Sequence, residues 1–260
     1  PDYGYITNFG KAHLEGFGSL EGVIKGKTEL YAHLQKNNKL IFVNANDPQQ
    51  VEISKPLSKY PFGDSNQDCY VALKNATGNV IVQYKGADIK SNLVGLYNFH
   101  NIAAAIAIGD YFKVSAEKIK EAIEGYIPQN NRSQIIQQNG HTILLDAYNA
   151  NPTSMMAALE NFKQAEGHNK IMILGDMFEL GVEAEAEHQA ITDYLAEHKF
   201  GKAYLVGENF SKTETTATHI TKHRDFETFK NALIAEKLEK NTILIKGSRG
   251  MALERSLALL

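Results

Sequence analysis

The densest group of side chains that could do chemistry lies between Asp146 and Met155, in the stretch Asp-Ala-Tyr-Asn-Ala-Asn-Pro-Thr-Ser-Met. Asp146, Tyr148, Asn149 and Asn151 offer one carboxylate, one phenol and two carboxamides. These groups can hydrogen-bond sugar hydroxyls and a heteroaromatic base. Spacing alone fits equally well a polar turn that ends in a helix cap.

The elements around this stretch favour a ligand site. The apolar run Thr142–Leu145 is typical of a strand and leads into it. Asn151 can cap a following helix, and Pro152 suits its first position because the missing N–H would have no partner there. The apolar face of that helix consists of Met155, Leu159 and Phe162. Turns from strand to helix are where α/β proteins bind ligands.

Length and composition limit the classes of protein. A chain of 260 residues with 43% hydrophobic residues predicts one or two packed domains. A net charge of −3 without a basic stripe argues against nucleic acid as a partner. The single cysteine, Cys69, excludes an internal disulfide framework and fits a reducing compartment, so we expect a cytoplasmic location. No apolar run approaches about 20 residues, and the start at Pro1 resembles no signal peptide.

The first half of the chain begins with a predicted strand at Tyr3–Asn8 and a glycine-rich loop at Gly10–Ser19. Ser19 can cap a helix whose apolar face holds Leu20, Val23, Ile24 and Leu30. Gly26-Lys27-Thr28 lies within that helix. It is not a phosphate loop, because the glycine that the Walker pattern requires is replaced by Glu21.

The next segment contains a parallel strand, an antiparallel insertion and then two helices, as its residue pattern predicts. Leu40–Val43 predicts a buried parallel strand, and Tyr70–Leu96 predicts an antiparallel insertion because its apolar residues alternate between turns. A helix should open at Asn98 and run to about Phe112. Ser115 should cap another, whose apolar face is formed by Ile119, Ala122, Ile123 and Tyr126.

The second half should begin after the polar connection Pro128–Arg132, the predicted domain boundary. Asn139-Gly140 predicts a hairpin between flanking strands. Later strands and helices then alternate, as in a parallel sheet with crossover helices. The predicted strands are 171–174, 203–206 and 243–245, and the predicted helices start near Glu183 and span 226–238 and 251–259.

Long motifs in a fixed order then narrow the class. They are Ile6–Ser19 with Lys27–Leu30, Asp146–Met155, Leu174–Gly181 with His188, and Lys246–Met251. Together they resemble the Mur ligases from about Tyr5 to Arg255. The resemblance implies an α/β protein: a partial, P-loop-type central ATP-binding domain at 1–132, then a Rossmann-like C-terminal domain with a mainly parallel sheet at 133–260.

The resemblance also implies an activity, an ATP-dependent acid–amino-acid ligation that needs Mg²⁺. The implied substrates are a UDP-N-acetylmuramoyl-tripeptide and D-alanyl-D-alanine, joined during assembly of the peptidoglycan precursor. The γ-phosphate of ATP would move to the tripeptide carboxylate, and the dipeptide amine would attack the acyl phosphate. Magnesium and cationic groups would spread the developing charge.

Several residues of the first domain match the family's functional positions. His13 matches a histidine ligand to Mg²⁺, and Lys27 matches a lysine that becomes carbamylated. The carbamate makes chemical sense because an ammonium would repel Mg²⁺, whereas a carbamate offers two hard oxygen ligands. Asn98 and Asn101 match paired asparagines beside the nucleotide, although Tyr97 stands where the family commonly has His.

The remaining matches lie at and beyond the boundary. Arg132 resembles a hinge arginine near the phosphates and is the third expected catalytic residue. By the same resemblance Asp146 binds the ribose hydroxyls, and Tyr148, Asn149 and Asn151 surround the adenosine. The residues expected to contact the dipeptide or the intermediate are Lys246, Ser248 and Arg249. For Asp176 and Glu179 a loop-shaping role is favoured over an acid–base pair, and for His188 a satisfied position at the core edge.

Three family features are missing from the residues given: the phosphate loop, a glutamate ligand to magnesium and the UDP-binding domain. We therefore expect the C-terminal part of a monomeric ligase, inactive by itself and prone to self-association. Two alternatives stay open: a related ATP-dependent ligase, either of another Mur step or of folylpolyglutamate type, and a catalytically silent nucleotide-binding or interaction module. A dehydrogenase is disfavoured because no strand is followed by Gly-x-Gly-x-x-Gly.

Overall fold

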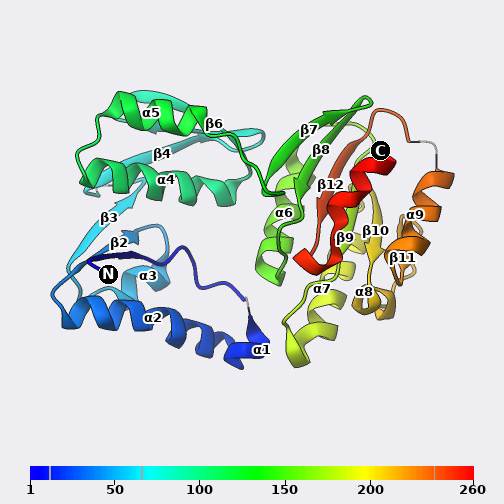
Figure 1. The fold of residues 1–260 in the computed structure, drawn as a ribbon, viewed down its shortest axis with the longest axis horizontal. Helices are drawn as coiled ribbons and strands as arrows, with labels where there is room; N and C mark the ends of the chain where they lie inside the picture. The colour runs from blue at the N-terminus through cyan, green and yellow to red at the C-terminus, as the bar shows by residue number, and fades with distance from the viewer. Residues whose placement is uncertain (12, 66, 237) are drawn as a thin grey trace. The chain divides into compact units, whose positions relative to one another are not determined.

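The computed structural model describes residues 1–11, 13–65, 67–236 and 238–260. These residues form two compact units. Unit 1 comprises Pro1–Gly10 and Phe17–Ile127, and unit 2 comprises Lys11–Gly16 and Pro128–Leu260. Each unit has a six-stranded sheet within the described ranges, accompanied by helices (Figure 1). The predicted α/β class with mainly parallel sheets is confirmed.

The sheet of unit 1 has the order β1-β2-β3-β4-β5-β6. Its strands are β1 (Tyr3–Tyr5), β2 (Leu40–Asn44), β3 (Lys59–Gly63), β4 (Cys69–Asn75), β5 (Asn79–Tyr84) and β6 (Ala87–Val94). Strands β1 to β4 pair in parallel, whereas β5 is antiparallel to both of its neighbours. The predicted antiparallel insertion is therefore present, and β1 lies at the edge of the sheet.

The helices of unit 1 follow local capping signals. They are α2 (Leu20–Lys36), α3 (Pro48–Ile53), α4 (Leu96–Tyr111) and α5 (Ala116–Gly125), while the short α1 (Leu14–Phe17) ends where the two units divide. The Ser19 hydroxyl accepts from Gly22 N at the start of α2, and Ser115 caps α5 in the same way. Helix α3 and strand β3 were missed, because both are too short to show a clear hydrophobic period.

One predicted helix face was partly wrong. In α5, Ile119 is buried and Ile123 half-buried, but Ala122 and Tyr126 are exposed. The helix ends at Gly125, so Tyr126 leaves the helical path and no longer shares its face. The predicted strand Tyr3–Asn8 is also shorter than expected and ends at Tyr5.

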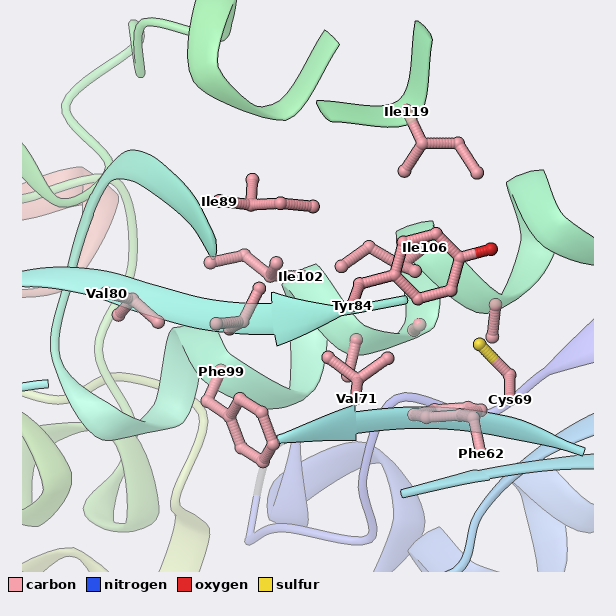
Figure 2. Close-up of a cluster of buried hydrophobic side chains, with 14 of the residues drawn as sticks. Phe62, Cys69, Val71, Val80, Tyr84, Ile89, Phe99, Ile102, Ile106 and Ile119 are labelled. Carbon is pink, nitrogen blue, oxygen red and sulfur yellow. The ribbon is translucent and has the colours of Figure 1, made fainter. Parts of the chain in front are cut away.

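Side chains from strands and helices meet in the core of unit 1 (Figure 2). Phe62, Val71 and Val82 from the sheet pack against Ile102 and Ile106 of α4. The cysteine side chain belongs to the same cluster, where burial raises its thiol pKa to about 12. The cysteine is thus a small apolar core residue, unsuited to thiolate chemistry near neutral pH.

The sheet of unit 2 has the order β11-β10-β9-β12-β8-β7. Its strands are β7 (Gln134–Gln138), β8 (His141–Asp146), β9 (Ile171–Gly175), β10 (Lys202–Val206), β11 (Ile220–His223) and β12 (Thr242–Lys246). Its helices are α6 (Pro152–Gln164), η1 (Gly181–Glu183), α7 (Ala184–His198), α8 (Glu208–Lys212), α9 (Phe226–Ala235), η2 (Arg249–Met251) and η3 (Leu253–Leu259). All pairs are parallel except β7 with β8.

Local signals were reliable in this unit. Asn139 and Gly140 have φ of 48° and 83°, the left-handed pair that a tight hairpin turn between β7 and β8 needs. Asn151 caps α6 through Ser154 N, and the Ser154 hydroxyl accepts from Asn151 N in return. The predicted capped helix with an apolar face is confirmed.

Three expectations for unit 2 need correction. The segment after β10 holds the unpredicted α8 and β11, both too short for a clear period. The last predicted helix consists of two 3₁₀ segments that meet at Ala252, whose left-handed backbone (φ 48°) interrupts α-helical winding. The predicted helix at 226–238 ends at Ala235, and its residue 237 lies outside the described residues.

Candidate functional site

The carboxyl ends of three neighbouring strands in unit 2 carry most of the predicted site residues. Strands β8, β12 and β9 lie side by side and run in parallel, so the loops that follow them meet at one edge of the sheet. These loops, 149–151, 178–179 and 248–250, line a cavity of about 130 Å³ together with His13. Such an edge is where open α/β sheets bind ligands.

A buried ion pair lies at the base of this edge. Lys246 and Asp146 are register partners in β12 and β8. The Lys246 ammonium, on a side chain only 2% exposed, lies 2.6 Å from Asp146 Oδ2 and donates to the carbonyl of Asn149 at 3.2 Å. The other Asp146 oxygen accepts from Ser133 N at 3.2 Å. The pair therefore joins two strands and the start of the loop after β8.

The other two residues of the predicted dipeptide site differ in exposure. Ser248 is buried and its hydroxyl accepts from Phe178 N, whereas the Arg249 guanidinium is exposed. The Arg249 side chain has an ion-pair partner, Glu254, at 3.4 Å. Of Lys246, Ser248 and Arg249, the last is the cation that a ligand can reach from solvent.

The predicted nucleotide residues are partly brought together. The Arg132 guanidinium stacks over the ring of Tyr148 at 3.7 Å, a cation–π contact. The backbone supports this arrangement, because Tyr148 N donates to Asn131 O at 3.1 Å. Asn149 and Asn151 lie at the cavity, with the Asn151 side-chain oxygen committed to the cap of α6.

His13 lies in the segment of unit 2 that precedes α1. Its Nδ1 hydrogen-bonds the carboxylate of Glu179, and Glu15 N donates to Glu179 O at 3.0 Å. The backbones of His13 and Glu179 are both left-handed, with φ of 55° and 62°. Residue 12 of the same motif lies outside the described residues.

Asp176 and His188 shape the loop that carries Glu179. Asp176 is buried, and its carboxylate accepts from Asn209 N and Phe210 N at the start of α8. His188 is fully buried; its Nδ1 donates to Ala184 O, and its Nε2 accepts from Met177 N at 3.0 Å.

Burial lowers the pKa of His188, and its bonds require the neutral ring, because Nε2 acts as an acceptor. These contacts agree with the loop-shaping interpretation of Asp176 and with a satisfied histidine at 188.

In unit 1 the predicted carbamylation site lies on α2. Lys27 is half-buried and donates from Nζ to Asn8 O at 2.8 Å, and burial lowers the pKa of its ammonium. Lys25, two residues earlier, is exposed. Thr28 donates back to Ile24 O, as in a continuous helix. The conclusion that this Gly-Lys-Thr is no phosphate loop therefore holds.

The paired asparagines of α4 contact each other. Asn98 is buried and donates from Nδ2 to Val94 O at 2.8 Å. The Asn101 carboxamide donates to Asn98 Oδ1 at 3.2 Å. Asn98 therefore holds the exposed Asn101 in place.

The contact between Asn44 and His100 in unit 1 was not predicted from the sequence. Asn44, at the end of β2, donates from Nδ2 to His100 Nδ1 at 3.2 Å, and burial lowers the pKa of His100. Because Asn44 ends a buried parallel strand, its position was a usable signal for a site residue. Its partner on α4 could be found only in three dimensions.

Both units match the same family. The Mur ligase middle domain matches residues 1–109, and the Mur ligase, glutamate ligase domain matches residues 131–249. The chain therefore belongs to the Mur ligase family, as its motifs predicted. No helix among the described residues is long and apolar enough to cross a membrane.

The relatives define a branch within that family. The UDP-N-acetylmuramoyl-tripeptide–D-alanyl-D-alanine ligase of Bacillus subtilis is 30% identical over 264 residues, which is 98% of this chain and 58% of the relative. The chain thus spans 58% of the length of that relative.

Solved structures of two MurF proteins have a similar fold. MurF from Acinetobacter baumannii has a TM-score of 0.84 at 28% identity, covering 99% of this chain and 59% of that one. MurF from Thermotoga maritima, solved in complex with ADP, shares the fold with a TM-score of 0.83 at 22% identity, over 100% and 61% of the two chains.

Proposed function

We propose that the protein carrying these two units is an ATP-dependent ligase that joins D-alanyl-D-alanine to a UDP-N-acetylmuramoyl-tripeptide. The observation that carries the proposal is the meeting of three motif loops around one cavity, in a chain similar over 98% of its length to a ligase of that name. Its ATP-dependent chemistry and nucleotide-linked substrate assign it to the cytoplasm.

Asp146 suits the ribose hydroxyls. Its side chain is 15% exposed, and a carboxylate has about four acceptor positions, of which Lys246 and Ser133 use two. The Lys246 ammonium, 2.6 Å from Asp146 Oδ2, holds the carboxylate at the end of β8. Tyr148, Asn149 and Asn151 are the proposed adenosine neighbours in this unit.

Arg132 is the proposed cation for the phosphates. Its guanidinium lies over the ring of Tyr148, so the group proposed to flank the adenosine also positions the charge. Charge held in advance is what stabilises a transferring phosphoryl group. In unit 1 we assign Asn101 to the nucleotide and Asn98 to the orientation of Asn101.

Lys27 is the proposed carbamate. The neutral amine is the form that attacks CO₂: an N–C bond forms, the nitrogen loses a proton, and a carboxylate with two hard oxygens results. Burial lowers the pKa of Lys27 and so increases the fraction of neutral amine at a given pH.

His13 is the second proposed ligand to Mg²⁺. Within the described residues no group of three or more His, Cys, Asp or Glu could hold a metal ion. The family resemblance is the ground for proposing both His13 and the carbamate as donors, and the nucleotide phosphates would be further oxygen donors. When bound, Mg²⁺ would neutralise phosphate charge.

Arg249 is the proposed anchor for the dipeptide carboxylate, since an exposed guanidinium binds carboxylates through two parallel hydrogen bonds.

The tripeptide carboxylate attacks the γ-phosphorus, an O–P bond forms and ADP leaves. The dipeptide amine then attacks the acyl carbon and loses a proton. The C–O bond breaks and inorganic phosphate leaves.

Two substitutions with opposite selectivity test the assignment in the protein expressed from its complete gene. Asp146→Asn should raise KM for ATP about 10- to 100-fold, the effect of one charge-assisted hydrogen bond, with little change in KM for D-alanyl-D-alanine. Arg249→Gln should do the reverse. Arg224→Gln is the matched control, because Arg224 is also an exposed arginine in an ion pair, with Glu208.

Steady-state phosphate release measures all three variants, with a thermal unfolding curve to check folding. Phosphate release that needs no dipeptide, or no phosphate release at all, would reject the proposed ligation. The second result would favour a silent nucleotide-binding module.

A further inference from the structure

Ser248 connects the three loops of the cavity in unit 2. Its backbone N–H donates to Asp176 O at 3.1 Å, in the loop after β9. Its hydroxyl oxygen accepts from Phe178 N at 2.8 Å in the same loop. The hydroxyl also donates to Ala150 O at 3.4 Å, in the loop after β8. One residue of the β12 loop therefore binds both neighbouring loops.

The loop after β9 is also held at Glu179, whose carbonyl oxygen accepts from Glu15 N at 3.0 Å and whose carboxylate hydrogen-bonds His13. Met177 N is bonded to His188 Nε2, and the next amide, Phe178 N, is bonded to Ser248. Beyond these two amides the chain turns through the left-handed Glu179. The exposed Phe178 and Glu179 line the cavity beside Arg249. The Ser248 hydroxyl is thus the contact that fixes the Phe178 amide of this wall.

The hydroxyl has little capacity left for a ligand. A serine hydroxyl has one proton to donate and two acceptor positions. Its proton is directed to Ala150 O and one acceptor position is taken by Phe178 N, on a side chain 3% exposed. A substrate acceptor such as a carboxylate oxygen could therefore bind this hydroxyl only if its bond to Ala150 O broke.

Burial by itself does not explain these bonds. Ser256, in the same unit, is also fully buried, yet its hydroxyl has no hydrogen-bond partner within the described residues. A buried serine of this unit can therefore exist without such contacts. The bonds of Ser248 follow from its place between three loops.

We propose that Ser248 is a positioning residue that sets the distance between Arg249 and the Phe178–Glu179 wall, and that it does not itself bind the dipeptide. The kinetic consequence rests on the proposed ligation. The link between the loops rests on the hydrogen bonds alone, so the two can be tested separately.

The experiment compares Ser248→Ala with Ser256→Ala in the protein expressed from its complete gene. Amide exchange by NMR reports the loop through Phe178 and the fold through Ile171–Leu174 of β9. Loss of one buried hydrogen bond should speed exchange of the Phe178 amide about tenfold in Ser248→Ala, with β9 unchanged. Ser256→Ala should change neither. Ligation kcat/KM should fall about 10- to 100-fold in Ser248→Ala alone, because small misplacements cost that much.

Each other result rejects part of the proposal. Unchanged exchange at Phe178 with a raised KM for the dipeptide would mean that Ser248 contacts the dipeptide directly. Faster exchange with normal kinetics would mean that the wall has no role in ligation. Loss of β9 protection in Ser248→Ala would make Ser248 a residue of the fold. If the unsubstituted protein does not ligate, the proposed function fails, while exchange at Phe178 still decides whether Ser248 links the loops.

Discussion

Each unit places a lysine near the carboxyl edge of its sheet, and the two lysines have opposite surroundings. Lys246 of unit 2 is buried against the carboxylate of Asp146, its register partner on the next strand. Lys27 of unit 1 is half-buried and donates to the neutral carbonyl of Asn8. A carboxylate partner holds an ammonium in its charged form, whereas burial beside a neutral group favours the free amine.

The contrast separates a lysine that supports structure from the lysine that we propose as the carbamate. A buried ion pair is costly to break, because the remaining charge has no partner. A lysine with a lowered pKa is a nucleophile closer to neutral pH. The comparison therefore predicts a large loss of stability at Lys246, and a small loss of stability with a large loss of reactivity at Lys27.

The largest effect should come from Lys246→Met. Removal of the ammonium leaves Asp146 largely buried and unpaired, so the unfolding free energy of unit 2 should fall by about 3 kcal/mol. Denaturant titration, with hydrogen exchange of the β9 amides as the readout, measures this loss of unfolding free energy. The double variant Lys246→Met with Asp146→Asn should recover much of the loss. A loss below about 1 kcal/mol in the single variant would remove the contrast between the two lysines.

The next largest effect on stability concerns Asp110, near the end of α4 in unit 1. Asp110 accepts from Tyr60, Tyr84 and Lys85. Burial alone would raise the pKa of Asp110, but the hydrogen bonds from Lys85 and the two phenols lower it to about 2. Asp110 is thus a largely buried aspartate with neutral and cationic donors.

Asp110→Asn should lower the unfolding free energy of unit 1 by about 2 kcal/mol at pH 7. The folded pKa lies below the unfolded value of about 3.9, so this stability is complete above about pH 4 and is lost as pH falls through about 2. Acid titration should show that step in the unsubstituted protein and not in Asp110→Asn. Asp88→Asn, an exposed aspartate of β6, is the control. An unchanged acid step in Asp110→Asn would assign the pH dependence to another group.

The smallest effect on stability should come from Lys27→Met, within about 1 kcal/mol, because a half-buried lysine loses one hydrogen bond to a carbonyl. Carbamylation at position 27 should be lost in this variant. With ¹³C-bicarbonate, a carbamate signal should appear in the unsubstituted protein and in Lys25→Met, the exposed neighbour, but not in Lys27→Met. Equal carbamate signals from the unsubstituted protein and both variants would mean that the carbamate forms on another residue.

Features whose causes lie within a few residues could be predicted from the order of the residues. Asn151, Pro152 and Ser154 start α6 through a capping box, and Asn139-Gly140 turns the β7–β8 hairpin. The family motifs belong here too, because they are continuous stretches. Caps and turns depend on groups up to about four residues apart, so the chain order alone identifies them.

The contacts that hold the site together join residues far apart in the chain, and they could not be predicted from it. Asp146 meets Lys246, 100 positions away, because β8 and β12 became neighbours in the sheet. Ser248 reaches Phe178 for the same reason, and its motif does not reveal that its hydroxyl faces inward. The strand order that creates these contacts is set by packing of whole elements, and single stretches of sequence do not contain it.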